Sequence, residues 1–209
     1  MSSSVRASEN GDGVFTGLVM DLGEVGAVEQ TADGVRLSVR TTLTDEVSPG
    51  DSVAINGVCL TATSVDDGAF AADVMNETLE RSSLGGAGAG ARVNVELPLR
   101  PADRLGGHVV QGHVDGLGTV ARVEVDGFAR RVRIEPEDAA QLRYVVEKGS
   151  IAVDGVSLTV SAIDDTGFEV SLIPETLERT NLGHLEPRGV VNLEFDVLAK
   201  YVERLVASR

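Results

Sequence analysis

The chain is poor in several residue types, and each shortage excludes something. Among 209 residues there is no tryptophan and one cysteine, Cys59, which excludes an internal disulfide and favours a reducing cytoplasm. No apolar run approaches the roughly 20 residues that a membrane span needs, and no signal peptide opens the chain. Lysine is almost missing as well, since only Lys148 and Lys200 are present.

Charge of one sign dominates the polar residues. The formal net charge is −15 at pH 7, which argues against a general nucleic-acid binder because phosphates would be repelled. Strong acidity with scarce lysine predicts a protein of a salt-rich, halophilic cytosol, where screening tolerates self-repulsion. The alternative is an ordinary acidic soluble protein.

A ten-residue stretch that begins at Ser52 is repeated at Ser150, 98 positions later. Without a gap the register extends to two further pairs of segments, which are Glu77-Thr78-Leu79-Glu80-Arg81 with Glu175-Thr176-Leu177-Glu178-Arg179, and Val93-Asn94-Val95-Glu96 with Val191-Asn192-Leu193-Glu194. Two copies of about a hundred residues indicate a duplicated domain and not a solenoid. What the copies share is largely polar and turn-forming, which indicates a repeated binding site.

Abundant Val, Thr and Gly predict an all-β fold. Asn56-Gly57 and its counterpart Asp154-Gly155 are strong signals for two-residue hairpins, because these residues tolerate positive φ. After the first turn, alternation places Cys59 and Thr61 on one face of a strand and Leu60 on the other. In the second copy, Ser157 and Thr159 repeat this arrangement, with Leu158 on the opposite face.

Helix signals are few. Residues 77–84 and 175–182 predict short helical turns. Gly85 and Gly183 are expected to end them as C′ residues, and Pro174 stands at a position that suits the start of the second. Near the C-terminus an apolar stripe predicts an amphipathic helix whose apolar face needs either the barrels or another subunit; it consists of Leu198, Tyr201, Val202, Leu205 and Val206.

Several motifs in fixed order resemble the riboflavin synthase family: Phe15-Thr16-Gly17, Asn56-Gly57-Val58-Cys59-Leu60-Thr61, Gly106-Gly107-His108, Gly112-His113-Val114, Asp154-Gly155-Val156-Ser157-Leu158-Thr159 and Pro174-Glu175-Thr176-Leu177-Glu178-Arg179. The resemblance implies two tandem six-stranded Greek-key β-barrels, a C-terminal helix that assembles a homotrimer, and no cofactor. It divides the chain into a disordered extension (1–13), a first lumazine-binding barrel (14–107), a second (108–197) and a trimerisation helix (198–209).

The resemblance also implies a reaction. Two molecules of 6,7-dimethyl-8-ribityllumazine dismutate to riboflavin and 5-amino-6-(D-ribitylamino)uracil, by transfer of a four-carbon unit. Two related half-sites suit two identical substrates that must meet face to face. In the family the working site lies between the first barrel of one subunit and the second barrel of its neighbour. The rival hypotheses are a non-catalytic lumazine- or flavin-binding protein on the same duplicated barrel and a generic oligomerisation module.

By resemblance the substrate-binding residues fall into two half-sites. The first is expected to contain Gly17, Leu18, Val19, Ser52, Cys59, Leu60, Thr61, Asp73, Val74, Met75, Asn76, Glu77 and Thr78. The second is expected to contain Gly112, His113, Val114, Ser157, Leu158, Thr159, Ser171, Leu172, Ile173, Pro174, Glu175 and Thr176, with Lys148 and Asp196 alongside.

Four of these residues are catalytic candidates. His113 and Cys59 would assist proton movement at the acidic C7 methyl group, and Ser157 and Thr159 would position an attacking water or hydroxide. No structural metal is expected, since Cys59 is the only thiol and a spacing of five sends His108 and His113 to opposite faces of one strand.

Several candidates have ordinary structural alternatives. Cys59 could be a core residue, Thr78 and Thr176 could only support their helical turns, and Asp196 could be an N-cap. Lys148 could be a solvated surface lysine, although a planar guanidinium would not replace a compact ammonium in a binding site.

Overall fold

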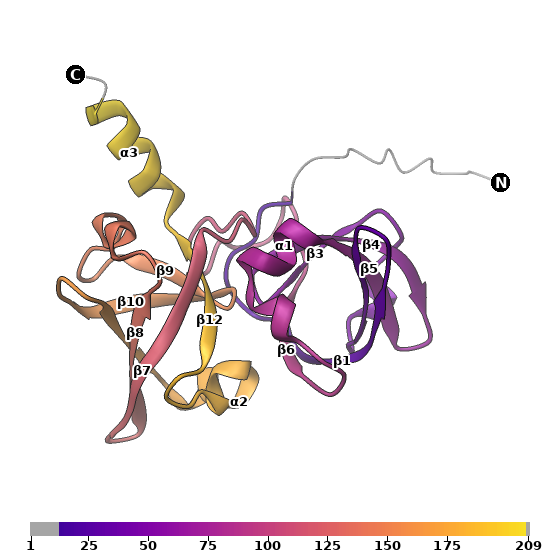
Figure 1. Ribbon diagram of the computed structural model, residues 1–209, viewed down its shortest axis with the longest axis horizontal. Helices are drawn as coiled ribbons and strands as arrows, with labels where there is room; N and C mark the ends of the chain where they lie inside the picture. Colours follow the sequence, from indigo (N-terminus) through magenta and orange to yellow (C-terminus); the bar gives the residue numbers. More distant parts are fainter. Residues whose placement is uncertain (1–12, 208–209) are drawn as a thin grey trace.

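The computed structural model describes residues 13–207 and forms two closed antiparallel β-barrels followed by a helix (Figure 1). The predicted N-terminal extension therefore lies, apart from Gly13, outside the described residues. Each barrel has six strands, and the two have the same cyclic order, which is β1-β2-β5-β4-β3-β6 in the first and β7-β8-β11-β10-β9-β12 in the second. The predicted all-β fold of two six-stranded barrels is confirmed.

The first barrel contains β1 (Asp21–Gln30), β2 (Gly34–Arg40), η1 (Thr44–Glu46), β3 (Ser52–Ile55), β4 (Val58–Asp66), β5 (Ala69–Met75), α1 (Asn76–Arg81), η2 (Ser83–Gly86) and β6 (Arg92–Glu96). The second contains β7 (Gly116–Asp126), β8 (Ala129–Pro136), η3 (Ala139–Tyr144), β9 (Ser150–Val153), β10 (Val156–Ile163), β11 (Phe168–Leu172), α2 (Pro174–Arg179), η4 (Asn181–His184) and β12 (Val190–Phe195). Helix α3 (Val197–Ala207) follows the second barrel and projects from it (Figure 1).

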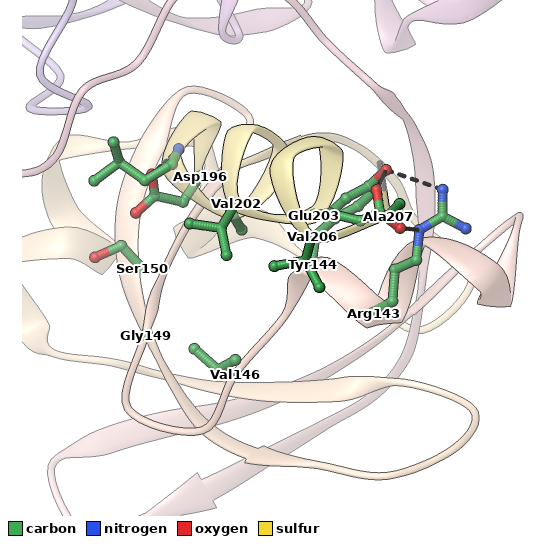
Figure 2. A pocket seen from close by; sticks show the side chains of 12 residues that line it. Arg143, Tyr144, Val146, Gly149, Ser150, Asp196, Val202, Glu203, Val206 and Ala207 are labelled. Atoms are coloured by element: carbon green, nitrogen blue, oxygen red, sulfur yellow. Dashed lines mark hydrogen bonds and ion pairs between the residues drawn. The ribbon is translucent and has the colours of Figure 1, made fainter. Parts of the chain in front are cut away.

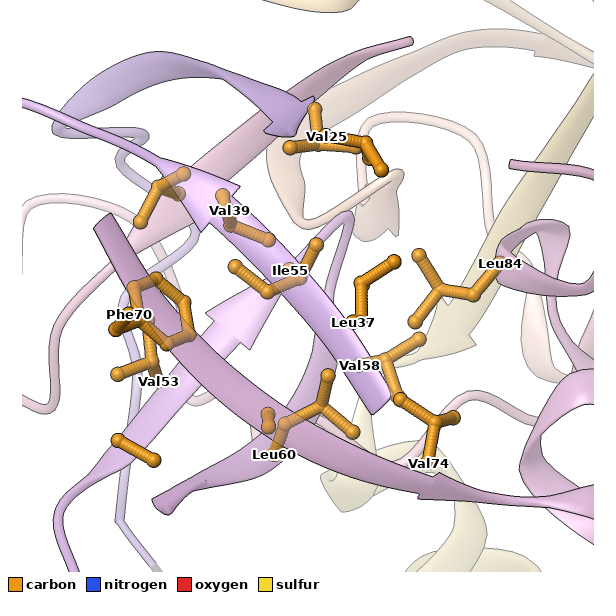
Figure 3. Close-up of a cluster of buried hydrophobic side chains, with 14 of the residues drawn as sticks. Val25, Leu37, Val39, Val53, Ile55, Val58, Leu60, Phe70, Val74 and Leu84 are labelled. Atoms are coloured by element: carbon orange, nitrogen blue, oxygen red, sulfur yellow. The ribbon is translucent and has the colours of Figure 1, made fainter. Parts of the chain in front are cut away.

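Each barrel has its own core of alternating inward side chains. In the first barrel, Val39, Ile55 and Phe70 are at most 1% exposed and face one another across the interior (Figure 3). Burial of each such side chain contributes about 1.5–3 kcal/mol, so the alternation in the sequence is enough to set which face of each strand turns inward. A smaller apolar cluster joins the two barrels, and it consists of Phe15, Ala54, Val110 and Ala152.

Both predicted hairpins are present, and their tips meet. Asn56 and Gly57 have φ of 48° and 75°, and Asp154 and Gly155 have 45° and 76°. A Cβ on Gly57 would lie 2.7 Å from the backbone nitrogen of Gly155, a separation that side chains do not tolerate. Glycine is therefore required here both for the turn and for the contact between the barrels.

Amide side chains surround this contact with approximate twofold symmetry. Asn94 Nδ2 donates to the Asp154 carbonyl at 2.8 Å, and Asn192 Nδ2 donates to the Asn56 carbonyl at the same distance. Asn181 Nδ2 donates to Asp154 Oδ2 at 2.8 Å. These hydrogen bonds satisfy buried polar groups and fix how the two barrels dock.

The two short helices end differently from the prediction. Helix α1 stops at Arg81 because Ser82 is extended (φ −137°, ψ 161°), and Gly85 lies inside the 3-10 turn η2 and not at a C′ position. Gly85 is needed for another reason: a Cβ there would lie 2.3 Å from the Leu79 carbonyl oxygen. In the second barrel Gly183 lies inside η4 in the same way, whereas Pro174 starts α2 as predicted.

The apolar stripe of α3 is confirmed and lies on the surface of this single chain. Its members are between 59% and 68% exposed; they are Leu198, Tyr201, Val202, Leu205 and Val206. Among the helices of residues 13–207, none combines the length and apolar character that a membrane crossing requires.

Candidate functional site

Two short segments that precede the barrels cross between them. We call residues 15–17 the first strap and residues 110–112 the second strap. They pair with each other through Phe15 and Val110, whose amides donate to the partner's carbonyl at 2.8 and 3.1 Å. Each strap runs into the first strand of its own barrel, yet its glycine contacts the other barrel.

The contacts of the two glycines set the composition of the half-sites. Ser157 N donates to the Gly17 carbonyl at 2.8 Å, and Cys59 N donates to the Gly112 carbonyl at 2.9 Å. A Cβ on Gly17 would lie 2.6 Å from Ser157 Cβ, and one on Gly112 would lie 2.6 Å from Cys59 Cβ. Since both glycines also have positive φ (74° and 76°), only glycine brings the backbone this close.

The predicted grouping of the half-sites was therefore wrong at the straps. Gly17 lies beside Ser157 of the second barrel and not beside Cys59, and Gly112 lies beside Cys59 of the first barrel and not beside Ser157. The physical reason is the duplication: both barrels offer an equivalent segment at the start of β4 and of β10, and each strap hydrogen-bonds to that segment of the opposite barrel.

Two buried glutamates hold the straps. Glu96, at the end of β6, accepts hydrogen bonds from Thr16 N and Oγ1 (both 2.7 Å) and from Gly17 N (3.1 Å). Burial raises the pKa of Glu96 above its ordinary value, against the lowering effect of these donors.

Glu194, at the end of β12, plays the same part for the second strap. It accepts from the backbone amides of Gln111 (2.6 Å), Gly112 (2.9 Å) and His113 (3.0 Å). Burial raises the pKa of Glu194 to about 7, with Asp115 acting in the same direction, although the Gln111 and Gly112 amides and Lys200 lower it.

A hydroxyl and an imidazole meet at the Gly17 side. His108 Nδ1 and Ser157 Oγ are 2.7 Å apart, and His108 is 8% exposed. Burial lowers the pKa of His108, with Asp196 acting in the opposite direction, so the neutral imidazole is favoured. Its Nε2 is buried and has no hydrogen-bond partner within residues 13–207. A neutral imidazole bonded to a hydroxyl is an arrangement that can accept or relay a proton.

His108 was not among the predicted site residues, although it belongs to the Gly106-Gly107-His108 motif. The prediction that His108 and His113 lie on opposite faces of one strand was wrong, because this segment lies outside the named strands and only Val110 forms a β-bridge. His113 is exposed, whereas His108 is buried.

On the strands, the alternation follows the prediction. In β4, Leu60 is 7% exposed and faces the core, while Cys59 is partly accessible and Thr61 exposed. In β10, Ser157 is partly accessible and Thr159 exposed, but Leu158 is only partly buried. Ser52 pairs with Thr61 across β3 and β4.

The segments at the ends of β5 and β11 carry both core and surface residues. Val74 and Leu172 are at most 2% exposed and belong to the cores, so their side chains are not available to a ligand. Met75 and Ile173 are 69% and 51% exposed and offer apolar surface at equivalent places.

Charged candidates in these segments already have partners. Arg36 binds the Asp73 carboxylate with two hydrogen bonds (2.7 and 3.0 Å), which lower the pKa of Asp73. Glu77 forms an ion pair with Arg81, and Glu175 forms the equivalent pair with Arg179.

The remaining predicted residues lie around these elements. Ser171, near the end of β11, is exposed, as is Asn76 at the start of α1. Lys148 is exposed in the turn before β9, with φ of 66°. Asp196 Oδ1 accepts from Leu198 N at 2.9 Å, which is the bond expected of an N-cap. The charge of Asp196 also raises the pKa of His108, against the larger effect of burial.

The geometry thus defines a class: duplicated six-stranded barrels in which the strap of each barrel contacts the other barrel. A family model described as lumazine binding domain matches twice, over residues 16–98 and 111–196. The chain therefore belongs to the proteins built from two lumazine-binding domains.

Comparison with curated proteins narrows this class. The chain is 52% identical over 200 residues to "Riboflavin synthase" of Mycobacterium tuberculosis (strain H37Rv), covering 93% of this chain and 99% of that protein. It is 40% identical to the riboflavin synthase of Actinobacillus pleuropneumoniae (94% and 91% covered) and 38% identical to that of Schizosaccharomyces pombe (93% and 95% covered). It is a member of the riboflavin synthase family.

Solved structures share the fold. The crystal structure of LumP complexed with 6,7-dimethyl-8-(1'-D-ribityl) lumazine has a TM-score of 0.78 at 23% identity, covering 86% of this chain and 98% of that chain. The structure of LumP complexed with riboflavin has a TM-score of 0.79 at 23% identity, covering 87% and 98%.

Proposed function

We propose that this chain converts two molecules of 6,7-dimethyl-8-ribityllumazine to riboflavin and 5-amino-6-(D-ribitylamino)uracil by transfer of a four-carbon unit. The chain is a transferase of the riboflavin synthase family, as its full-length relatives indicate. The observation that carries the proposal is that the same contact between a strap and the opposite barrel occurs in both copies. Each has a strap glycine on a partly accessible side chain, Cys59 in one and Ser157 in the other.

The geometry suits a reaction between two bound rings. Holding both substrates in fixed positions makes the transfer effectively intramolecular, which can supply on the order of 7–11 kcal/mol of the barrier. At the Ser157 half-site, neutral His108 and the Ser157 hydroxyl can move a proton to or from the bound ring. Cys59 and His113 are our candidates for proton movement at the C7 methyl group, and Thr159 for positioning water.

We propose that the active assembly is a homotrimer held by α3. The helix is tied to its own barrel by Glu203, which binds Tyr144 Oη (2.6 Å) and Arg143 (2.7 Å). Beside it lies a groove of about 620 Å³, with Val202 and Val206 on its helix side and Val146 on its barrel side (Figure 2). A second copy would cover this apolar surface and place the first barrel of one subunit beside the second barrel of its neighbour.

We further propose a cytoplasmic location and adaptation to salt. The single cysteine fits a reducing compartment. The net charge of −15 with two lysines fits a salt-rich cytosol, and it predicts higher activity and stability in molar KCl than in dilute buffer.

One assay tests the proposed function directly. The purified protein is incubated with 6,7-dimethyl-8-ribityllumazine alone, and riboflavin fluorescence and the pyrimidinedione are measured. We expect both products in equal amounts. Saturable lumazine binding without riboflavin would instead establish the non-catalytic binding protein.

A further inference from the structure

Glu96 and Glu194 are buried carboxylates that take no part in the proposed chemistry. They are 5% and 4% exposed, and they occupy equivalent positions at the ends of β6 and β12. An ionisable group is costly to bury unless its hydrogen-bonding capacity is used. The hydrogen bonds that these two carboxylates accept therefore indicate what they do in the fold.

Each glutamate accepts three hydrogen bonds, which are shared between both carboxylate oxygens; those of Glu96 come from the first strap, and those of Glu194 come from the second strap and from His113 directly after it. Glu194 Oε1 receives Gln111 N, while Oε2 receives the amides of Gly112 and His113. Glu96 Oε1 receives the two Thr16 donors and Oε2 receives Gly17 N. A glutamine offers one acceptor oxygen and would turn its NH₂ toward a donor, so only a carboxylate satisfies all three.

The straps held in this way end on the proposed site residues of the opposite barrel. Gly17 O accepts from Ser157 N, and Gly112 O accepts from Cys59 N. Gly112 therefore connects Glu194 to Cys59, because its amide donates to Glu194 and its carbonyl accepts from Cys59. Gly17 connects Glu96 to Ser157 in the same way.

We propose that Glu96 and Glu194 are a matched pair of positioning residues, each fixing the strap that completes the half-site of the other barrel. The proposal rests on the proposed function and assigns each glutamate to a different half-site. Glu194 sets the surroundings of Cys59, and Glu96 sets those of Ser157 and His108. Neither touches the substrate.

The single cysteine makes the assignment measurable without turnover. The rate at which iodoacetamide alkylates Cys59 reports the local backbone and the access to the thiol. Glu96→Gln and Glu194→Gln are compared with the wild type, and Glu29→Gln, at an exposed strand end, is the control for loss of one carboxylate. Cooperative urea unfolding is measured for every variant.

We expect Glu194→Gln to change the alkylation rate at least threefold and to weaken its protection by 6,7-dimethyl-8-ribityllumazine. Glu96→Gln should leave the alkylation rate within a factor of two of the wild type. Both should lower kcat at least tenfold with cooperative unfolding retained, and Glu29→Gln should match the wild type throughout.

Three results would overturn the proposal. Equal alkylation rates in all four proteins would show that Glu194 does not set the surroundings of Cys59. Wild-type kcat in both glutamine variants would remove any positioning role, and loss of cooperative unfolding would make the glutamates general fold determinants. If the wild type makes no riboflavin, the proposed function fails, whereas the alkylation comparison still decides the role of Glu194.

Discussion

Replacing Asp154 with asparagine should change how the stability of the protein depends on pH. Asp154 is 3% exposed, and within residues 13–207 its carboxylate accepts hydrogen bonds from two amides, Asn192 N (2.7 Å) and Asn181 Nδ2 (2.8 Å). Burial raises its pKa from 3.8 to about 6. The equivalent residue of the first copy, Asn56, is already neutral.

The sign follows from proton linkage. Between pH 3.8 and about 6 the folded chain keeps a proton on Asp154 that the unfolded chain loses, so its contribution to stability falls as pH rises. The difference between a pKa of 3.8 and one of about 6 corresponds to on the order of 3 kcal/mol. Because an unfolded carboxyl is already mostly ionised at pH 4.5, about 2 kcal/mol of this falls between pH 4.5 and 8.

Urea unfolding measures the effect. We expect the free energy of unfolding of Asp154→Asn to gain about 2 kcal/mol on the wild type between pH 4.5 and 8, a difference of about 1 M in urea midpoint. Other raised groups, such as Glu96 and Glu194, are common to both proteins and cancel. Protein concentration is held constant because assembly would add to stability.

The exposed Asp67 provides the control, since Asp67→Asn removes the same charge from the surface. It should run parallel to the wild type across this range. Any fixed gain or loss of hydrogen bonds at residue 154 shifts the whole curve and not its slope. A stability difference between Asp154→Asn and the wild type that stays constant from pH 4.5 to 8, or that falls, would refute the reasoning.

The remaining predictions concern assembly and turnover. Truncation after Asp196 should give monomers in sedimentation and abolish turnover, and a trimeric, active product would contradict the role of α3. Cys59→Ser and Ser157→Ala should each slow turnover at least tenfold with the fold intact, whereas wild-type rates in both would reduce the two side chains to structural fillers. Lys148→Met should slow turnover by about 100-fold and more than Lys148→Arg if its charge stabilises an anionic intermediate; wild-type rates in both variants would remove Lys148 from the site.

Much of the fold could be predicted because its signals are local. The Asn56-Gly57 turn needs positive φ at two adjacent residues, and asparagine followed by glycine predicts such a turn because both residue types tolerate positive φ. Alternation fixed the inward position of Leu60 because a slip of one residue would expose the whole strand. The ends of the short helices were missed, since Gly85 is needed for the close approach of the Leu79 carbonyl and not for a left-handed cap.

The arrangement of the half-sites could not be predicted in the same way. A duplicated chain presents two equivalent strand segments, at the start of β4 and of β10, and the residues of a strap are compatible with either. Which of the two segments Gly17 contacts depends on packing between residues 140 positions apart in the sequence, and no local pattern predicts it. The buried glutamates were visible in principle, because Glu96 and Glu194 stand at matching positions of the repeat.

Comparison of the two copies separates what holds the site from what acts in it. The groups that hold the backbone are the same in both copies: Glu96 and Glu194, and the strap glycines that they position. The side chains next to those glycines differ, since one half-site has a thiol at Cys59 and the other a hydroxyl at Ser157 bonded to His108. A thiol is the stronger acid, and a hydroxyl with a neutral imidazole is the better proton relay. The two proposed half-sites therefore share the same strap contact but differ in proton chemistry, which suits a reaction in which one of two identical substrates gives up four carbons and the other receives them.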